Sequence, residues 1–387
     1  MRLSPVDHVF TGRGGYPINF LFSYNGKLEA SAIQDSLLEC LNYFSPLKSQ
    51  LRHLNSHTLE FFETQNSLAW HQQTLHSEVD FDNLESLDSL LSRAKSLPDS
   101  PLIEISLTYT PNKSYLGVSI SHCVVDGFSY FLFLTTWSQI HRKMSINKPE
   151  LNREILLAKN WNNTSSEINV EDIFQKTGFA LSKIPRPAND DRVEWEIIDF
   201  KKNEIDKLYN EATSQTDVRL SVNDVLSAHL WKKIAEAQSK LRSADSLYSL
   251  SCAYDYRRVF PNISPLYFGN AIRAASIRLS AEKIKSASLS ELAISLNRAV
   301  RAIDAKACEE SLECLEHLRI AKGLEVLENF HVADPETGFL VTNLSRLPVL
   351  DLDFGVGAPN DFRILTPARN TAVVLPLRDG LRVQIAR

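Results

Sequence analysis

Cysteine and positive charge are both scarce in this sequence. Its five cysteines are an odd number in 387 residues and form no CxxC pair. Such a sparse set is typical of reduced thiols in a cytosolic protein, and it excludes thiolate zinc knuckles. The 42 Lys and Arg residues do not outnumber the 47 Asp and Glu, and the net charge is −5. A duplex nucleic-acid binder usually has a basic face, so we expect no nucleic-acid partner.

Long apolar runs are also missing. No run of 18 apolar residues is present to span a membrane, and the opening MRLSPVDHVF has no apolar segment typical of a signal peptide. We therefore expect a cytoplasmic protein without a membrane partner. The hydrophobic share of 43% and charged share of 23% exclude wholesale disorder and fibrous classes. At roughly 100–200 residues per domain, the length favours two domains.

A predicted hairpin places a histidine where a strand ends. Apolar and polar residues alternate over 103–109 and 116–120, with turn residues at 111–114 between them. This pattern predicts two strands with one buried face. By parity, His122 continues the buried positions of the second strand, and an apolar stretch over 128–142 predicts a helix after it. Loops in this position often carry function.

The remaining pattern predicts a mixed α/β protein with two domains. We expect domains over 1–150 and 193–387, joined by a crossover segment at 151–192 that holds a helical stretch or two. Residues 3–7 form a predicted turn. Further helices are expected at 30–43, 84–94, 309–328, and after capping boxes at Ser221 and Ser288. Further strands are expected at 193–200, 372–375 and 382–385.

The motif with most chemical content is HxxxDG, formed by His122, Asp126 and Gly127. Histidine has an ordinary pKa of about 6.5, so it can accept a proton near neutral pH. This short pattern alone fits a core histidine beside a turn aspartate equally well. A Cys123–His122 dyad is disfavoured because neighbours on an extended chain point to opposite sides. No third ligand stands at a spacing that would give a zinc site.

A second motif, DFGVG at residues 353–357, stands near the end of the chain. HxxxDG followed at long distance by this motif resembles the BAHD acyltransferases of the CoA-dependent acyltransferase superfamily. Further segments resemble that family along essentially the whole chain; they are Leu3–Asp7, Phe44–Leu47, Ser221–Trp231, Asp255–Arg258, Tyr267–Ala271 and Val341–Pro348. Two positions differ, because Leu344 and Val356 stand where the family usually has tryptophan.

The resemblance implies a fold of two chloramphenicol acetyltransferase-like domains, each a mixed β-sheet flanked by helices, with the active site at their interface. It implies that His122 is a general base and that Thr342 is the candidate donor to the oxyanion. Asp126 would pair with Arg257, and Leu344 would shape the acceptor pocket. Structural roles are implied for four further residues: Gly127, Asp353, Gly355 and Gly357.

The reaction implied by the resemblance transfers an acyl group from acyl-CoA to a small-molecule alcohol or amine. It proceeds through a ternary complex in a monomer, and it needs no metal and no cofactor beyond the CoA co-substrate. No Lys or Arg cluster in the sequence identifies the CoA contacts, so these residues stay unnamed.

Two other functions share the same fold. A condensation-type domain would take its acyl group from a carrier protein, but such domains usually have a second histidine where Ser121 stands. A non-catalytic relative would bind a ligand without acyl transfer. The presence of His122, Asp126, Arg257 and Asp353 argues against that alternative.

Overall fold

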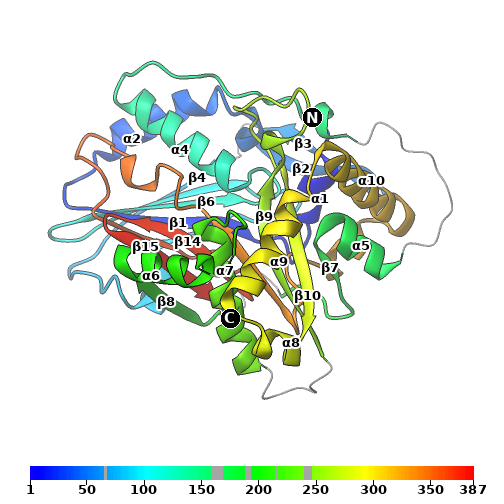
Figure 1. Cartoon of the computed structure of the whole chain (residues 1–387). Coiled ribbons are helices and arrows are strands. Elements are labelled where there is room, and N and C mark those ends of the chain that lie inside the picture. The colour runs from blue at the N-terminus through cyan, green and yellow to red at the C-terminus, as the bar shows by residue number, and fades with distance from the viewer. Residues whose placement is uncertain (65–67, 158–168, 188–192, 215, 239–245) are drawn as a thin grey trace.

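The computed structural model describes the chain except residues 65–67, 158–168, 188–192, 215 and 239–245. Two main β-sheets organise the described residues (Figure 1). The first sheet has the order β13–β1–β6–β5–β4. Its strands are β1 Pro17–Tyr24, β4 Leu68–Thr74, β5 Ile103–Tyr109, β6 Ser114–Ser121 and β13 Asp361–Ile364.

The second sheet has the order β10–β9–β12–β14–β15–β8. Its strands are β8 Trp195–Phe200, β9 Leu247–Asp255, β10 Ile272–Ser280, β12 Gly338–Asn343, β14 Thr371–Leu377 and β15 Gly380–Ala386. Two short pairs stand apart, namely β2 Ser49–Asn55 with β3 Thr58–Glu63 and β7 Ala180–Leu181 with β11 Phe330–His331.

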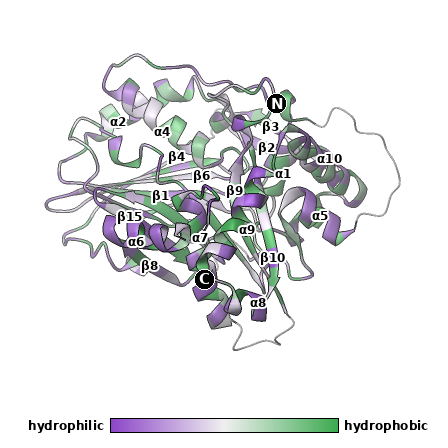
Figure 2. Ribbon diagram, viewed as in Figure 1, coloured by the Kyte–Doolittle hydropathy of each residue, from purple (hydrophilic) through white to green (hydrophobic). Residues whose placement is uncertain are grey.

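Helices cover one face of each sheet. Helices α2 Ala30–Leu41 and α4 Gly127–His141 pack together above the first sheet (Figure 1). Helices α6 Lys202–Thr213, α7 Val222–Gln238 and α9 Leu289–Arg301 share an apolar core with the second sheet. Hydrophilic residues dominate the outer turns of α6 and of α8 Ala281–Ser286 (Figure 2). Both sheets therefore bury apolar residues under amphipathic helices.

The sequence patterns located many of the helices and five of the strands. The hairpin, the helices near 30–43 and 128–142, and the three expected strands in the second half are all confirmed. The capping boxes are present too, because Asp224 N donates to Ser221 Oγ and Glu291 N donates to Ser288 Oγ, each at 3.2 Å. Serine at these positions satisfies a backbone N–H that the first helical turn leaves free.

Several details differ from the expectations. Residues 3–7 do not form a simple turn, because Ser4 caps helix α1 Pro5–Val9. The helix expected at 309–328 is α10 Ala305–Lys322, which ends at Gly323 with φ 76°. The hairpin does not have one buried face, since every residue of β6 is buried. The helices cover one side of β6. On the other side, leucines of residues 84–91 pack in one apolar cluster with Tyr115 of this strand.

The helix expected at 84–94 is much shorter. Helix α3 spans Leu84–Leu87 and is followed by one 3₁₀ turn. Beyond it, Ser92 N donates to Ser106 Oγ at 3.0 Å and Ala94 N donates to Ser119 Oγ at 2.8 Å. Side chains of the first sheet therefore take the backbone hydrogen bonds that a longer helix would have used.

The expected crossover segment contains helix α5 Val170–Thr177, and its residues 158–168 and 188–192 lie outside the described residues. The chain also crosses between sheets a second time. Strand β13 follows most of the second sheet in sequence, yet it pairs with β1 of the first sheet, with Ile364 opposite Phe20. The sequence range 193–387 therefore supplies an edge strand to the other half.

Candidate active site

His122 lies in the short loop between β6 and α4. Its ring stacks on Phe10 with the centroids 3.7 Å apart, and the ring of Tyr16 meets it edge-on at 5.5 Å. Nδ1 is buried without a hydrogen-bond partner, which leaves Nε2 as the ring nitrogen open to the cavity described below. The stacked and edge-on rings hold the imidazole in one orientation.

A buried polar network fixes the backbone of this loop. Asn270 Nδ2 donates to the backbone oxygen of His122 at 2.7 Å and to Asp7 Oδ1 at 2.9 Å. Arg153 binds Asp7 Oδ2 through Nε at 2.9 Å and the oxygen of Val124 through Nη2 at 2.7 Å. Asp7 and Asn270 stand in segments that resemble the family, but no sequence signal marked Arg153, which lies in the expected crossover segment.

The environment of His122 keeps its imidazole neutral. Burial lowers its pKa to about 4, and the loop carbonyl and the Asp126 carboxylate oppose this shift only in part. A pKa below its ordinary value leaves the ring unprotonated at neutral pH. The ring can therefore accept a proton there.

Asp126 forms an ion pair with Arg257. Arg257 Nη1 lies 2.8 Å from Asp126 Oδ2, and Nη2 lies 3.3 Å from Oδ1, so the predicted ion pair is present. Asp126 also caps α4 by accepting from Ser129 N at 2.8 Å, and it accepts from Ala271 N at 3.0 Å. Burial alone would raise the pKa of Asp126, but Arg257 and these donors lower it below the ordinary value.

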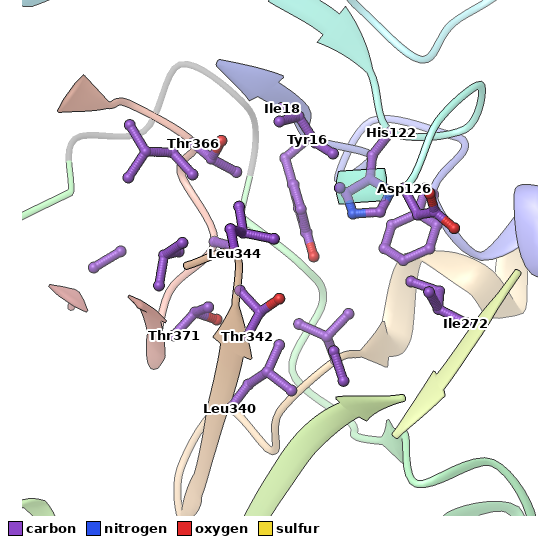
Figure 3. Close-up of a pocket in the computed structure, with 18 of the residues that line it drawn as sticks. Tyr16, Ile18, His122, Asp126, Ile272, Leu340, Thr342, Leu344, Thr366 and Thr371 are labelled. Atoms are coloured by element: carbon purple, nitrogen blue, oxygen red, sulfur yellow. The ribbon is translucent and has the colours of Figure 1, made fainter. Parts of the chain in front are cut away.

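A cavity beside His122 lies between the two sheets. Strand alternation builds its wall, because Phe339 and Val341 of β12 face the helices while Leu340 and Thr342 face the cavity. Figure 3 shows Thr342 and Leu344 across the cavity from His122. Most of the residues that line it are apolar and a few are polar, which is typical of small-molecule sites.

Gly127 and Leu344 both line this cavity, and they lie against each other. A side chain built on Gly127 would place its first carbon 2.8 Å from Cδ2 of Leu344. Glycine therefore lets Leu344 reach the start of α4. The leucine that departs from the family pattern thus forms part of the cavity wall.

The DFGVG loop lies outside the cavity, at the opposite end of α4. Asp353 Oδ1 accepts from Gly355 N at 2.8 Å and Gly357 N at 2.9 Å, and both glycines have φ near +90°. Ser138 near the end of α4 donates to the oxygen of Asp353 at 2.7 Å. The length of α4 separates this loop from His122 by about 20 Å. Asp353, Gly355 and Gly357 are therefore not part of the site.

Cys123 is unsuited to nucleophilic catalysis. Burial raises the pKa of its thiol to about 12, and Sγ lies 2.9 Å from Ser121 Oγ within the core. No group of three or more His, Cys, Asp or Glu side chains among the described residues could hold a metal ion. In the same part of the chain, no helix is long and apolar enough to cross a membrane.

Comparisons with known proteins agree with the motifs. The model of the Transferase family matches residues 1–386. Hydroxycinnamoyltransferase 1 of Oryza sativa subsp. japonica is 29% identical over 63% of this chain and 55% of its own length. Shikimate O-hydroxycinnamoyltransferase of Nicotiana tabacum is 28% identical over 63% of this chain and 56% of its own length. The match thus spans little more than half the length of these relatives.

Solved structures share the fold over the whole chain. TRI101 of F. sporotrichioides, complexed with coenzyme A and T-2, has a TM-score of 0.78 at 15% identity and covers all of this chain and 94% of its own. Vinorine synthase has a TM-score of 0.73 at 19% identity, covering all of this chain and 89% of its own. The expected fold of two mixed sheets flanked by helices is confirmed, and the chain belongs to the BAHD acyltransferases of the Transferase family.

Proposed function

We propose that the protein transfers an acyl group from a CoA thioester to a hydroxyl or amine of a small molecule, in specialised metabolism. The observation that carries this proposal is the buried imidazole of His122, whose Nε2 is open to a largely apolar cavity between the two sheets and whose pKa is lowered by burial. Relatives named for O-transfer to shikimate and for transfer to putrescine support both kinds of acceptor. We also propose that the protein is a monomer in the cytoplasm. Its five cysteines form no disulfide, which supports a reducing compartment.

In the proposed mechanism, the acceptor hydroxyl or amine donates its proton to Nε2 of His122. The freed oxygen or nitrogen attacks the thioester carbonyl, and the Thr342 hydroxyl donates to the resulting oxyanion. The C–S bond then breaks, and the CoA thiolate takes the proton from His122. Asp126 and Arg257 hold the loop in place and do not touch the substrates.

The assay that tests this function measures thiol release from acetyl-CoA and p-coumaroyl-CoA with a panel of alcohols and amines. A matching carrier-protein thioester is tested beside them. We expect release from CoA donors with intersecting initial-velocity lines, since direct transfer needs both substrates bound together. Release only from the carrier protein would support a condensation-type domain. Parallel lines, or an acyl group trapped on Cys123, would overturn the direct mechanism.

The pH dependence follows from the lowered pKa of His122. The neutral ring is the base, and its pKa of about 4 means that protonation begins only well below pH 6. We therefore expect kcat/KM to stay level from pH 8 down to about pH 5 and to fall below that. Circular dichroism at each pH controls for unfolding. A half-maximal value near pH 6.5 in folded protein would contradict the buried environment of this imidazole.

Thr342 is tested by a substitution that keeps its shape. Thr342→Val is expected to lower kcat by about 10²–10³-fold with little change in KM, because only the transition state carries the oxyanion. Thr371→Val is the matched control, since Thr371 also lines the cavity but donates its hydroxyl to the oxygen of Arg369 at 3.3 Å. Equal effects of the two substitutions would remove Thr342 from the mechanism.

A further inference from the structure

The wall of the cavity offers almost no free charge. Four ionisable residues line it among the described residues, namely Tyr16, His122, Asp126 and Arg273. Burial raises the pKa of the Tyr16 phenol, which therefore stays neutral. His122 is neutral at pH 7, as its lowered pKa requires. The Asp126 carboxylate is compensated by Arg257 and by two backbone N–H groups. Neither side chain can balance the charge of a substrate.

Arg273 turns its charge away from the cavity. Side chains alternate along β10, and Ile272 projects into the cavity beside Asp126 (Figure 3), so Arg273 lies on the other face. There its Nη1 donates to the oxygen of Ala307 at 2.8 Å and its Nη2 to that of Gln175 at 3.4 Å, while Nε has no partner. The guanidinium is therefore held against α5 and α10.

The remaining polar side chains of the cavity are also uncharged; they are hydroxyls, the indole of Trp195 and a glutamine that bonds to β13. Thr366 accepts from Asn19 N at 2.9 Å, and Thr371 binds a backbone oxygen. Figure 3 shows the hydroxyl of Tyr16 near the centre of the cavity, between His122 and Thr342. Much of the wall is apolar, so a carboxylate or ammonium placed there would lose its hydration without gaining a counter-ion.

We propose that the acceptor is a mainly apolar alcohol, or an arylamine that is uncharged at neutral pH, and that a second polar group of this acceptor binds the Tyr16 hydroxyl. This inference rests on the proposed acyl transfer and adds the chemical class of the acceptor. The cavity selects against acids and cations because desolvating them there is unfavourable.

Matched pairs of acceptors test this selection. The first pair is methyl 4-(hydroxymethyl)benzoate and its free acid, and the second is 4-neopentylbenzyl alcohol and its trimethylammonium isostere. With acetyl-CoA or p-coumaroyl-CoA, we expect kcat/KM for each neutral member to exceed that of its charged partner by about 100-fold or more. Equal or faster reaction of a charged member would overturn the proposal. A preference for the free acid that disappears in Arg273→Gln would also overturn the proposal. It would show that Arg273 is the counter-ion of the acceptor carboxylate.

If no acceptor releases CoA, the proposed acyl transfer fails, and binding to the same protein decides the acceptor class separately. A rise in Tm with the neutral members only would support an uncharged ligand, whereas a rise with the charged members, or with none, would overturn it.

Where transfer occurs, Leu344→Arg should shift the acid-to-ester ratio of kcat/KM at least about 10-fold toward the acid. Val356→Arg adds the same charge at an exposed position outside the cavity and should leave the ratio unchanged. Equal ratios in both variants would count against the proposal.

Discussion

Replacing His122 by alanine is expected to lower kcat for acyl transfer by about 10²–10⁴-fold while the protein stays folded. The imidazole is the neutral base at the cavity wall, and alanine leaves the acceptor proton without a destination. The loop itself should persist, because its contacts with Asn270 and Arg153 use backbone oxygens that alanine retains.

The measurement is single-turnover thiol release from acetyl-CoA, together with Tm and the Kd for CoA. His71→Ala is a control for residue type. His71 is half exposed on the outer strand β4, and its Nε2 lies 3.1 Å from Oε2 of Glu104. Near-normal turnover in folded His122→Ala would remove the general base from the proposed mechanism.

The sequence located the loop that carries His122 because the patterns on each side of it are formed by residues close together in the chain. Alternation over 103–120 placed the hairpin, the apolar stretch after Gly127 placed α4, and His122 lies between them. The partner of Asp126 is 131 positions away, and only the resemblance to known acyltransferases indicated Arg257. Contacts at such separations depend on tertiary packing, which no local periodicity records.

The features that the sequence did not reveal are those that join distant segments. Strand β13 is four residues long, and nothing in those residues shows that it pairs with β1 of the first sheet. Arg153 is one of several charged residues in the connecting segment, and its burial against Asp7 becomes visible only in the fold. The low charge of the cavity is likewise a property of several strands together.

The second large effect is expected at the buried pair of Asp126 and Arg257. Removing Arg257 leaves Asp126 without a cation inside the protein, and removing Asp126 leaves Arg257 with only the partly exposed Asp255, whose Oδ1 lies 3.0 Å from Nη1. Each single alanine variant should therefore lose about 3–5 kcal/mol of unfolding free energy. Both side chains are almost fully buried, with exposed fractions of 2% and 4%. Because the folded pKa of Asp126 lies below its ordinary value, this stabilisation is present at neutral pH and is lost as the pH falls through the folded pKa.

A double-mutant cycle measured by urea unfolding separates the pair from its other contacts. The double variant should lose less than the sum of the two single variants, since the second substitution no longer leaves an uncompensated charge. The exposed pair of Lys306 and Glu310, with Nζ and Oε1 3.6 Å apart, is the control and should give a coupling of about 0–1 kcal/mol. Additive losses at Asp126 and Arg257 would show that the two side chains act independently. In that case capping of α4, and not the ion pair, would be what Asp126 contributes.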